Sequence, residues 1–351
     1  MDILKSSIVA MFATLFCIWL LQPLAHHIGF VDRPGGRKEH AQNTPLIGGI
    51  AMFFGFCFAL LSLHVSLEAY RGMIAGSALL IMMGVVDDFK ELSSKLRLVG
   101  QMLATIFLIT WGNLLLNNLG NLFFLGDLHL GLWAFPVTVL VVIGYLNAMN
   151  MLDGQDGLAG GVALSQTLLL LVLAVQLNLY SDLRMLIILA VLLSVFLAFN
   201  MRFPWRRKAA VFMGDSGVTF IAFLIAWFAI QLSQVNTAIV KPMAVLWILA
   251  LPIFDLLAVS IFRMRRGRSL LVASRDHFHH VLHVAGLSVK LSTFLLCLLS
   301  LSLGAIGIAL NYWNVPEGWQ FLGLLFVLML YLVSVKFLRN PQKNVGKNAV
   351  S

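Results

Sequence analysis

Acidic side chains stand at the ends of several long apolar runs of this sequence, where they could hold a metal ion. They occur in four segments: Asp87-Asp88, Asp153-Gly-Gln-Asp156, Asp215 and Asp255. Carboxylates gathered at one level repel one another unless a cation neutralises them, and hard oxygen ligands suit Mg²⁺ or Mn²⁺. The pattern therefore indicates a site for a divalent cation and for the phosphate groups that such a cation binds.

Glycines surround two of these segments and permit tight turns against a ligand. They are Gly154, Gly157, Gly160, Gly161, Gly214 and Gly217. Taken singly, each segment has a simpler interpretation. Asp87 and Asp88 could be solvated residues at a helix end, residues 147–157 a plain turn, and Asp215 or Ser216 a helix N-cap. The occurrence of all of them on one face favours a common site.

The polar segment 263–290 carries basic side chains that could bind phosphate. Arg265, Arg275, His277, His279 and His280 belong to it. Arginine matches phosphate oxygens in bidentate geometry, and histidine donates hydrogen bonds and can carry charge near neutral pH. A lid that grips a pyrophosphate is the favoured interpretation. Zinc is an alternative because His279 and His283 are four residues apart, although no soft third ligand lies nearby; a solvated basic loop is another.

The elements that must position these groups are membrane helices. Of the 351 residues, 60% are hydrophobic and 11% are charged, against about 25% charged residues in soluble domains. A spanning helix needs about 20 mostly apolar residues. We expect eleven spans, near 3–25, 45–65, 70–86, 97–116, 133–150, 159–178, 184–200, 212–230, 242–262, 291–311 and 318–338. These runs do not alternate in polarity as barrel strands do, so the prediction is an all-α polytopic membrane protein.

The basic residues predict the orientation of these spans. With eleven spans, one set of loops holds 20 of the 24 Lys and Arg residues. Basic loops face the cytoplasm, which places the N-terminus in the periplasm and the C-terminus in the cytoplasm. The net charge of +9 then lies at the cytoplasmic face, against anionic lipid, and no motif indicates nucleic acid. We predict one catalytic domain, 1–338, with cytoplasmic loops 26–44, 87–96, 150–158, 200–211 and 263–290, followed by a polar tail, 339–351.

Five motifs follow one another between about residues 30 and 285. They are Val31–Gly49, Asp87-Asp88, Asn147-x-x-Asn150-x-x-Asp153-Gly-x-Asp156-Gly, Phe212-Met213-Gly214-Asp215-x-Gly217 and His277-x-His279-His280. Together they resemble the motifs of the polyprenyl-phosphate N-acetylhexosamine-1-phosphate transferases, a family of glycosyltransferase 4 type. Eleven spans and the His-x-His-His segment are similar to the branch that uses UDP-GlcNAc. The branch that transfers phospho-MurNAc-pentapeptide usually has ten spans and a longer histidine run.

The resemblance implies an enzyme of the bacterial inner membrane with its active site on the cytoplasmic face. It implies transfer of GlcNAc-1-phosphate from UDP-GlcNAc to undecaprenyl phosphate, the first lipid-linked step of O-antigen or enterobacterial common antigen synthesis, with Mg²⁺ or Mn²⁺ as cofactor. By the same resemblance, the catalytic residues are Asp87, Asp88, Asp215 and His279, and the metal ligands are Asp215 and Asp156. The substrate-binding residues are Lys38, Asn147, Asn150, Asp153, Asp156, Arg265, Arg275, His277 and His280.

Three alternatives to this function stay open in the sequence. Two are enzymes of the same class, one acting on UDP-MurNAc-pentapeptide and one on another UDP-sugar. The third is a membrane transporter, in which Pro136 and Pro252 could break helices. Transporters place polar sites near the bilayer midplane, whereas the acidic residues here end their apolar runs. The sequence leaves the choice between a monomer and a homo-oligomer open.

Overall fold

The computed structural model describes residues 2–32, 43–204, 206, 208–267 and 277–338. The first seven helices are α1 (Asp2–Ile28), α2 (Gly48–Leu61), α3 (Arg71–Lys90), α4 (Ser94–Thr110), α5 (Ala134–Leu152), α6 (Leu158–Gln176) and α7 (Tyr180–Asn200). The next six are α8 (Gly214–Val235), α9 (Pro242–Ile248), α10 (Ala250–Met264), α11 (Phe278–Val284), α12 (Val289–Tyr312) and α13 (Glu317–Leu338). Two 3-10 turns, η1 (Glu68–Tyr70) and η2 (Gly131–Trp133), and an antiparallel pair of short strands, β1 (Val31–Asp32) and β2 (Thr44–Pro45), complete the described elements.

The prediction of an all-α polytopic membrane protein is confirmed, and every predicted apolar stretch overlaps a helix. In the part of the chain that the structure describes, eight helices are long and apolar enough to cross a membrane, or nine if α9 and α10 form one bent span. With 14 and 17 residues, α2 and α4 are shorter than the usual spanning length of about 20. The helix lengths therefore support eight or nine spans and leave the predicted eleven unconfirmed.

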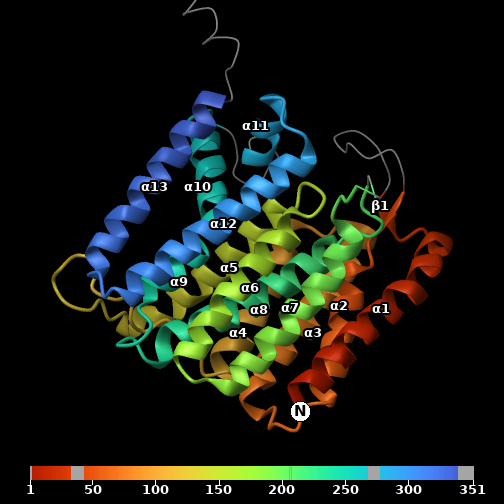
Figure 1. Ribbon diagram of the computed structural model, residues 1–351, viewed down its shortest axis with the longest axis horizontal. Coiled ribbons are helices and arrows are strands. Elements are labelled where there is room, and N and C mark those ends of the chain that lie inside the picture. Colours follow the sequence, from red (N-terminus) through yellow and green to blue (C-terminus); the bar gives the residue numbers. More distant parts are fainter. Residues whose placement is uncertain (1, 33–42, 205, 207, 268–276, 339–351) are drawn as a thin grey trace, which may run out of the picture.

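Helix α8 lies at the centre of the bundle (Figure 1). It packs against α2, α3, α5 and α6, and its large side chains, among them Phe220, Phe223 and Trp227, are buried. A helix that is apolar on all sides is stable only when other elements surround it or lipid does. Because Asp215 belongs to the first turn of α8, this central packing also fixes the position of that carboxylate.

Helices α3 and α8 approach each other closely at a glycine, Gly84 of α3. A Cβ atom at Gly84 would collide with the backbone of Ser216, and one at Gly49 of α2 would collide with Gly217. Small residues allow membrane helices to approach backbone to backbone. The contact at Gly84 brings the end of α3, with its acidic pair, beside the start of α8.

The segment before α2 holds the chain that leads into α8. The amide of Phe212 donates to the carbonyl of Pro45 at 2.9 Å. In return, the amides of Gly48 and Gly49 donate to the carbonyls of Phe212 and Met213 at 2.9 and 3.0 Å. Two motifs that are far apart in the sequence thus form one hydrogen-bonded unit at the entry to α8.

Proline breaks the ninth predicted stretch, where α9 and α10 meet at an angle of 70°. Pro252 has no N–H to donate to the carbonyl of Ile248. Gln166 of α6 supplies that hydrogen bond at 3.3 Å, and its own side-chain oxygen accepts from the Tyr145 hydroxyl at 2.6 Å. Pro136, the third residue of α5, causes no break, because the first turn of a helix tolerates proline.

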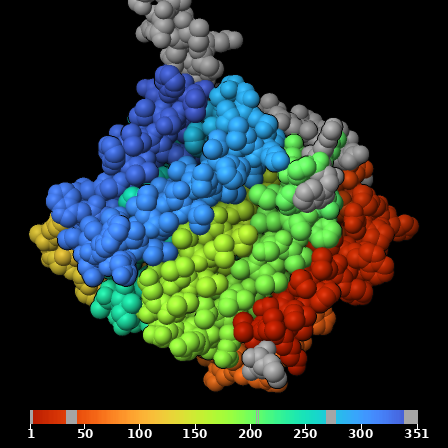
Figure 2. All heavy atoms as spheres, viewed as in Figure 1, coloured from red at the N-terminus to blue at the C-terminus, as the bar shows by residue number. Residues whose placement is uncertain are grey.

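Helices α12 and α13 cover one side of the bundle. Figure 2 shows them as a blue band next to the yellow-green and green surfaces of α6 and α7. Helix α12 packs against α6 and α9, and the short helix α11 packs against α12 and α13. The histidine segment, part of which forms α11, is therefore attached to this side of the molecule.

Candidate active site

Asp88, in the last turn of α3, accepts hydrogen bonds from the start of α8. Its Oδ1 accepts from the amide of Asp215 at 2.8 Å, and its Oδ2 accepts from the amide and hydroxyl of Ser216 at 3.3 and 2.8 Å. The first amides of a helix lack intrahelical partners and favour a negative charge. Gly214 adopts a φ of +74°, and a Cβ there would lie 2.6 Å from Asp88 Oδ2. Asp88 thus fixes the start of α8.

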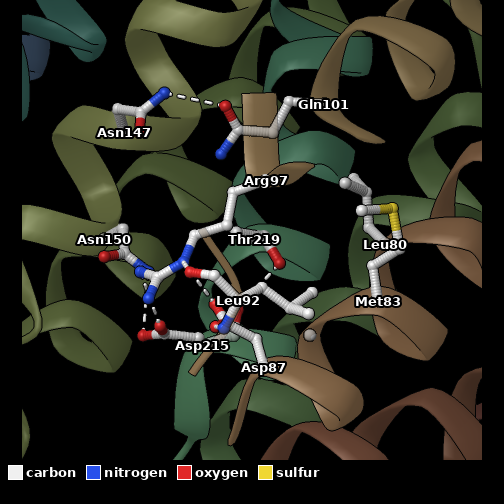
Figure 3. Close-up of a pocket in the computed structure, with 11 residues that line it drawn as sticks. Leu80, Met83, Asp87, Leu92, Arg97, Gln101, Asn147, Asn150, Asp215 and Thr219 are labelled. Carbon is white, nitrogen blue, oxygen red and sulfur yellow. Dashed lines mark hydrogen bonds and ion pairs between the residues drawn. The ribbon is translucent and has the colours of Figure 1, made fainter. Parts of the chain in front are cut away.

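A cavity beside this junction is lined by two further carboxylates, and Figure 3 shows Arg97 of α4 between them. Arg97 Nε lies 2.8 Å from Oδ2 of Asp87, and Arg97 Nη1 lies 3.4 Å from Oδ2 of Asp215. Asn150 of α5 donates to Oδ1 of Asp215 at 3.0 Å. The other lining residues are Leu80, Met83, Gly84, Leu92, Gln101, Asn147 and Thr219. The structure therefore brings four predicted site residues, Asp87, Asn147, Asn150 and Asp215, to one cavity.

Asn147 and Gln101 form another wall of this cavity (Figure 3). Asn147 Nδ2 donates to Gln101 Oε1 at 2.8 Å and to the carbonyl of Ile143 at 2.8 Å. The amide of Asn147 is therefore held by its own helix and by α4. Since α4 also carries Arg97, one helix positions both a cationic and an amide group at the cavity.

Asp156, in the loop between α5 and α6, is buried and already paired with a cation of the protein. Arg202 Nε lies 2.6 Å from its Oδ2, and the amide of Ala209 donates to the same oxygen at 3.3 Å. The next residue, Gly157, has a φ of +80° and donates its amide to the side chain of Asn200 at 2.7 Å. These bonds connect the loop to the end of α7 and the segment that follows it.

Asp153 lies at the C-terminal end of α5, where its side chain reaches solvent. Protein atoms nevertheless crowd it, and this loss of hydration, followed by the charges of Asp215, Asp88 and Asp156, raises the pKa of Asp153 to about 7. Like charges that cannot all ionise are stabilised by an added cation. The carboxylates of this region therefore favour binding of a metal ion or another positive group.

His277 is oriented by Asp255 of α10. The His277 Nδ1 atom lies 2.7 Å from Asp255 Oδ2, and the amide of Phe278 donates to Oδ1 at 2.9 Å. The Tyr331 hydroxyl of α13 donates to the same Oδ1 at 3.0 Å. Buried carboxylates require such partners, and together these bonds attach the start of α11 to α10 and α13.

His279 is buried against the loop that carries the acidic residues. A Cβ at Gly154 would collide with its Nε2, and neither ring nitrogen has a hydrogen-bond partner among the described residues. Burial, then the neighbouring His280 and His277, lower the pKa of His279 to about 3. The rings of His279 and His280 are 4.2 Å apart between centroids. His279 is therefore a neutral ring near neutral pH.

Known proteins are similar to this chain over most of its length. A family model described as glycosyl transferase family 4 matches residues 70–233. An undecaprenyl-phosphate alpha-N-acetylglucosaminyl 1-phosphate transferase of Yersinia pestis is 33% identical over 343 residues, which are 96% of this chain and 93% of that protein. The chain belongs to glycosyl transferase family 4. Proteins of the same name from Escherichia coli O157:H7 and Haemophilus influenzae are 31% and 32% identical, over 97% and 90% of this chain and 94% and 89% of their own lengths.

Asp215 of this family 4 protein is a carboxylate that could hold a divalent metal ion. Its two carboxylate oxygens receive hydrogen bonds from Arg97 and Asn150, so positive or donor groups stand where a cation would bind. In the described ranges, no three His, Cys, Asp or Glu side chains already converge as ligands. A hard ion would therefore take a carboxylate together with amide and phosphate oxygens. His283, which the zinc alternative needs, is hydrogen-bonded to Gln155 instead.

The remaining predicted site residues of the family 4 chain divide into two groups. Lys38 and Arg275 lie outside the described residues. Arg265 directly follows α10 and is exposed, while His280 lies beside His279.

Three residues with direct roles in this geometry were absent from the predicted site: Arg97, Gln101 and Arg202. Arg97 and Gln101 are four residues apart and share a helix face, ten and fourteen positions after Asp87, so their spacing was a usable signal. No signal in the sequence distinguished Arg202, because it is one of several basic residues in its loop. Asp255 stood among the acidic span ends, but its partner His277 comes 22 residues later.

Proposed function

We propose that this family 4 protein transfers GlcNAc-1-phosphate from UDP-GlcNAc to undecaprenyl phosphate and releases UMP. One observation carries the proposal: Asp87, Arg97, Asn150 and Asp215 meet at one cavity at the end of apolar helices. Such a site offers charged groups for a pyrophosphate within reach of a lipid substrate. Relatives named for this transfer match nearly the whole chain, which supports the same assignment.

The reaction needs no acid–base chemistry at carbon. An oxygen of undecaprenyl phosphate attacks the β-phosphorus of UDP-GlcNAc, and a new P–O bond joins the two phosphates. The bond from the β-phosphorus to the bridging oxygen breaks, and that oxygen leaves with UMP. The product is undecaprenyl-pyrophosphoryl-GlcNAc. Because the second pKa of a phosphate monoester is about 6, the acceptor is largely ionised near neutral pH, and Asp87 serves to orient it through Arg97 rather than to deprotonate it.

Asp215 is the proposed first ligand of Mg²⁺, with Mn²⁺ as the alternative. The ion supplies neutralisation of the charge that develops on the pyrophosphate. Asp156 is the proposed second ligand; its Oδ2 is held by Arg202 in this structure. Asp88 takes part indirectly, because it holds the turn of α8 on which Asp215 stands.

The other predicted residues are proposed to bind the two substrates. Asn147, Asn150 and Asp153 would hold the nucleotide sugar, and His277, His279 and His280 the pyrophosphate. Lys38, Arg265 and Arg275 would add positive charge around the phosphates. This division follows the chemistry of each side chain, since amides suit ribose and base, whereas imidazole and guanidinium groups suit phosphate.

We further propose that the chain has eleven spans in a bacterial inner membrane, with the N-terminus periplasmic and the C-terminus and active site cytoplasmic. The distribution of Lys and Arg supports this orientation. Residues 1–338 then form one catalytic domain and 339–351 a cytoplasmic tail. Cysteine accessibility at helix ends such as Glu91, after α3, and Tyr180, at the start of α7, would test the topology, because these two residues should label from opposite sides.

The activity is tested with detergent-purified protein, undecaprenyl phosphate and radiolabelled UDP-GlcNAc, with Mg²⁺ or with EDTA. Label that becomes lipid-extractable, with an equal amount of UMP and none in EDTA, is the expected result. Transfer from UDP-MurNAc-pentapeptide or another UDP-sugar alone would replace the substrate. Folded protein that transfers none of them would overturn the enzyme assignment, and substrate flux in liposomes would then support the transporter.

A further inference from the structure

His283 of α11 contacts a residue inside the acidic loop between α5 and α6. Its Nε2 atom lies 2.7 Å from Oε1 of Gln155, which stands between Asp153 and Asp156 in the sequence. Both side chains are half-buried. The contact joins two segments that are 128 residues apart in the chain, and neither residue has a part in the catalytic scheme above.

The hydrogen bonds continue beyond Gln155 into α12. Gln155 Nε2 donates to Thr293 Oγ1 at 2.9 Å and approaches Ser292 Oγ at 3.4 Å. The Thr293 hydroxyl then donates to the backbone carbonyl of Asp156 at 3.0 Å. The series thus begins on the histidine helix, crosses the acidic loop and α12, and returns to the backbone of a proposed metal ligand.

The imidazole ring of His283 is fixed on both sides. Its Nδ1 lies 3.0 Å from the carbonyl of Leu287, at the turn where Gly286, with a φ of +91°, ends α11. A carbonyl only accepts hydrogen bonds, so Nδ1 carries a proton. Gln155 Oε1 likewise only accepts, and the amide nitrogen of Gln155 donates to Thr293, so Nε2 of His283 is the donor in this contact.

The acidic loop has few other restraints from outside itself. Among the described residues, its other side-chain anchors are the Asp156 carboxylate, which Arg202 and the amide of Ala209 hold, and the bond from Gly157 to Asn200. At Gly154 the loop touches the buried ring of His279. A displacement of Gln155 would therefore move the acidic residues relative to the histidines of α11.

We propose that His283, Gln155 and Thr293 form a clamp that positions the acidic loop against α11 for sugar-phosphate transfer. They are positioning residues: they act through Asp153, Asp156 and His279 rather than on the substrates. This inference rests on the proposed function, because its effect on turnover is defined for that reaction. A geometric misplacement of about 1 Å in a catalytic group costs about 100-fold in rate, so loss of the clamp is expected to lower kcat.

Two substitutions of one residue separate the clamp from the local structure of α11. His283→Gln places an amide nitrogen close to the position of Nε2 and keeps the bond to Gln155. His283→Asn places an amide nitrogen close to the position of Nδ1, so it keeps the bond to Leu287 and loses Gln155. We expect His283→Gln to retain kcat within about threefold and His283→Asn to lose about tenfold, the equivalent of one hydrogen bond of about 1.4 kcal/mol. Equal kcat values for the two variants would overturn the clamp.

A double-mutant cycle tests whether the pair acts as a unit. Gln155→Leu alone should cost about as much kcat as His283→Asn alone, and the double variant no more than either, as for coupled residues. Additive losses would contradict the proposal. A positioning role also requires that the KM for UDP-GlcNAc change less than kcat.

Hydrogen exchange tests the clamp without any activity. In His283→Asn, the backbone amides of residues 150–158 should exchange faster than in the unmodified protein and in His283→Gln, while amides in the middle of α8 stay protected. Unchanged exchange in that loop would overturn the clamp even if kcat fell. If the unmodified protein transfers no sugar phosphate, the proposed function fails, and the exchange experiment still decides whether the clamp exists.

Discussion

The carboxylate of Asp88 holds Ser216 by two hydrogen bonds, one from its hydroxyl at 2.8 Å and one from its amide at 3.3 Å. A residue at the end of one helix thereby performs the task that an N-cap normally performs within a helix. This relationship separates the roles of two adjacent acidic residues. Asp87 lines the cavity, whereas Asp88 supports the first turn of α8.

Asp88→Ala is expected to lower both stability and activity. Loss of an N-cap interaction typically costs about 1–2 kcal/mol, and the amides of Asp215 and Ser216 would lose their acceptor. Asp88→Asn keeps one oxygen acceptor and should lose less of both. Thermal unfolding and transfer assays on the two variants check this expectation. A fully stable, inactive Asp88→Asn variant would instead assign Asp88 a direct role in the reaction.

Asp215→Asn is expected to abolish turnover without unfolding the protein. The exchange keeps the size of the side chain and its bond from Asn150 but removes the charge that would hold Mg²⁺. A loss of about 1,000-fold in kcat is expected for an electrostatic group of this kind. The stabilisation of the folded protein by Mg²⁺ against thermal unfolding should also disappear. Near-normal turnover, or an unchanged response to Mg²⁺, would show that another residue binds the ion.

Arg97→Ala should reduce transfer by about 100-fold, because two carboxylates lose their shared cation and the phosphates lose a bidentate donor. Arg97→Lys keeps the charge without the planar fork, so its transfer rate should lie between those of the unmodified protein and Arg97→Ala. Lys95→Ala, on the same helix and exposed, is the matched control and should behave as the unmodified protein. Equal losses at positions 95 and 97 would mean that only the total charge matters.

Acid should destabilise the protein through His279. Its folded-state pKa of about 3 lies below the ordinary value of 6.5, so the unfolded chain binds a proton that the folded protein excludes. Its contribution is therefore fully present above about pH 6.5 and is lost as the pH falls towards about 3, at no more than about 1.4 kcal/mol per pH unit. When the pH is lowered from about 7 to about 5, the melting temperature should decrease, and it should decrease less in His279→Gln than in the unmodified protein. The exposed His64 is the control, and an equal effect of His64→Gln would contradict the assignment.

The helices were predictable because a long apolar run has few other structures open to it in a membrane. Every predicted stretch overlaps a helix, and the acidic pair of α3 does meet Asp215 of α8, as their common face required. The sequence did not predict which helix lies at the centre of the bundle and which lie at its edge. The central place of α8 depends on neighbours such as Gly84 and Gly49, whose contact with it is a property of three helices at once.

The residues that were missed share a physical reason. Arg97 and Arg202 were counted as basic residues that set the orientation, and only their partners Asp87 and Asp156 distinguish them from other loop cations. Gln155 is uncharged, so nothing in its type suggested a link to His283. The pairing of His277 with Asp255 depends on where α10 points after the bend at the end of α9, and composition does not encode that angle.

The backbone contacts at Gly84 and Gly49 have a consequence for protein engineering. Any side chain at these positions would displace α8 and with it Asp215, so neither glycine can be replaced without changing the cavity that Gly84 and Asp215 line. Another part of the lining is built differently, because Gln101 and Asn147 meet there through their side chains. Variant libraries that aim at a different donor sugar should therefore diversify positions 101 and 147 and leave the glycines untouched.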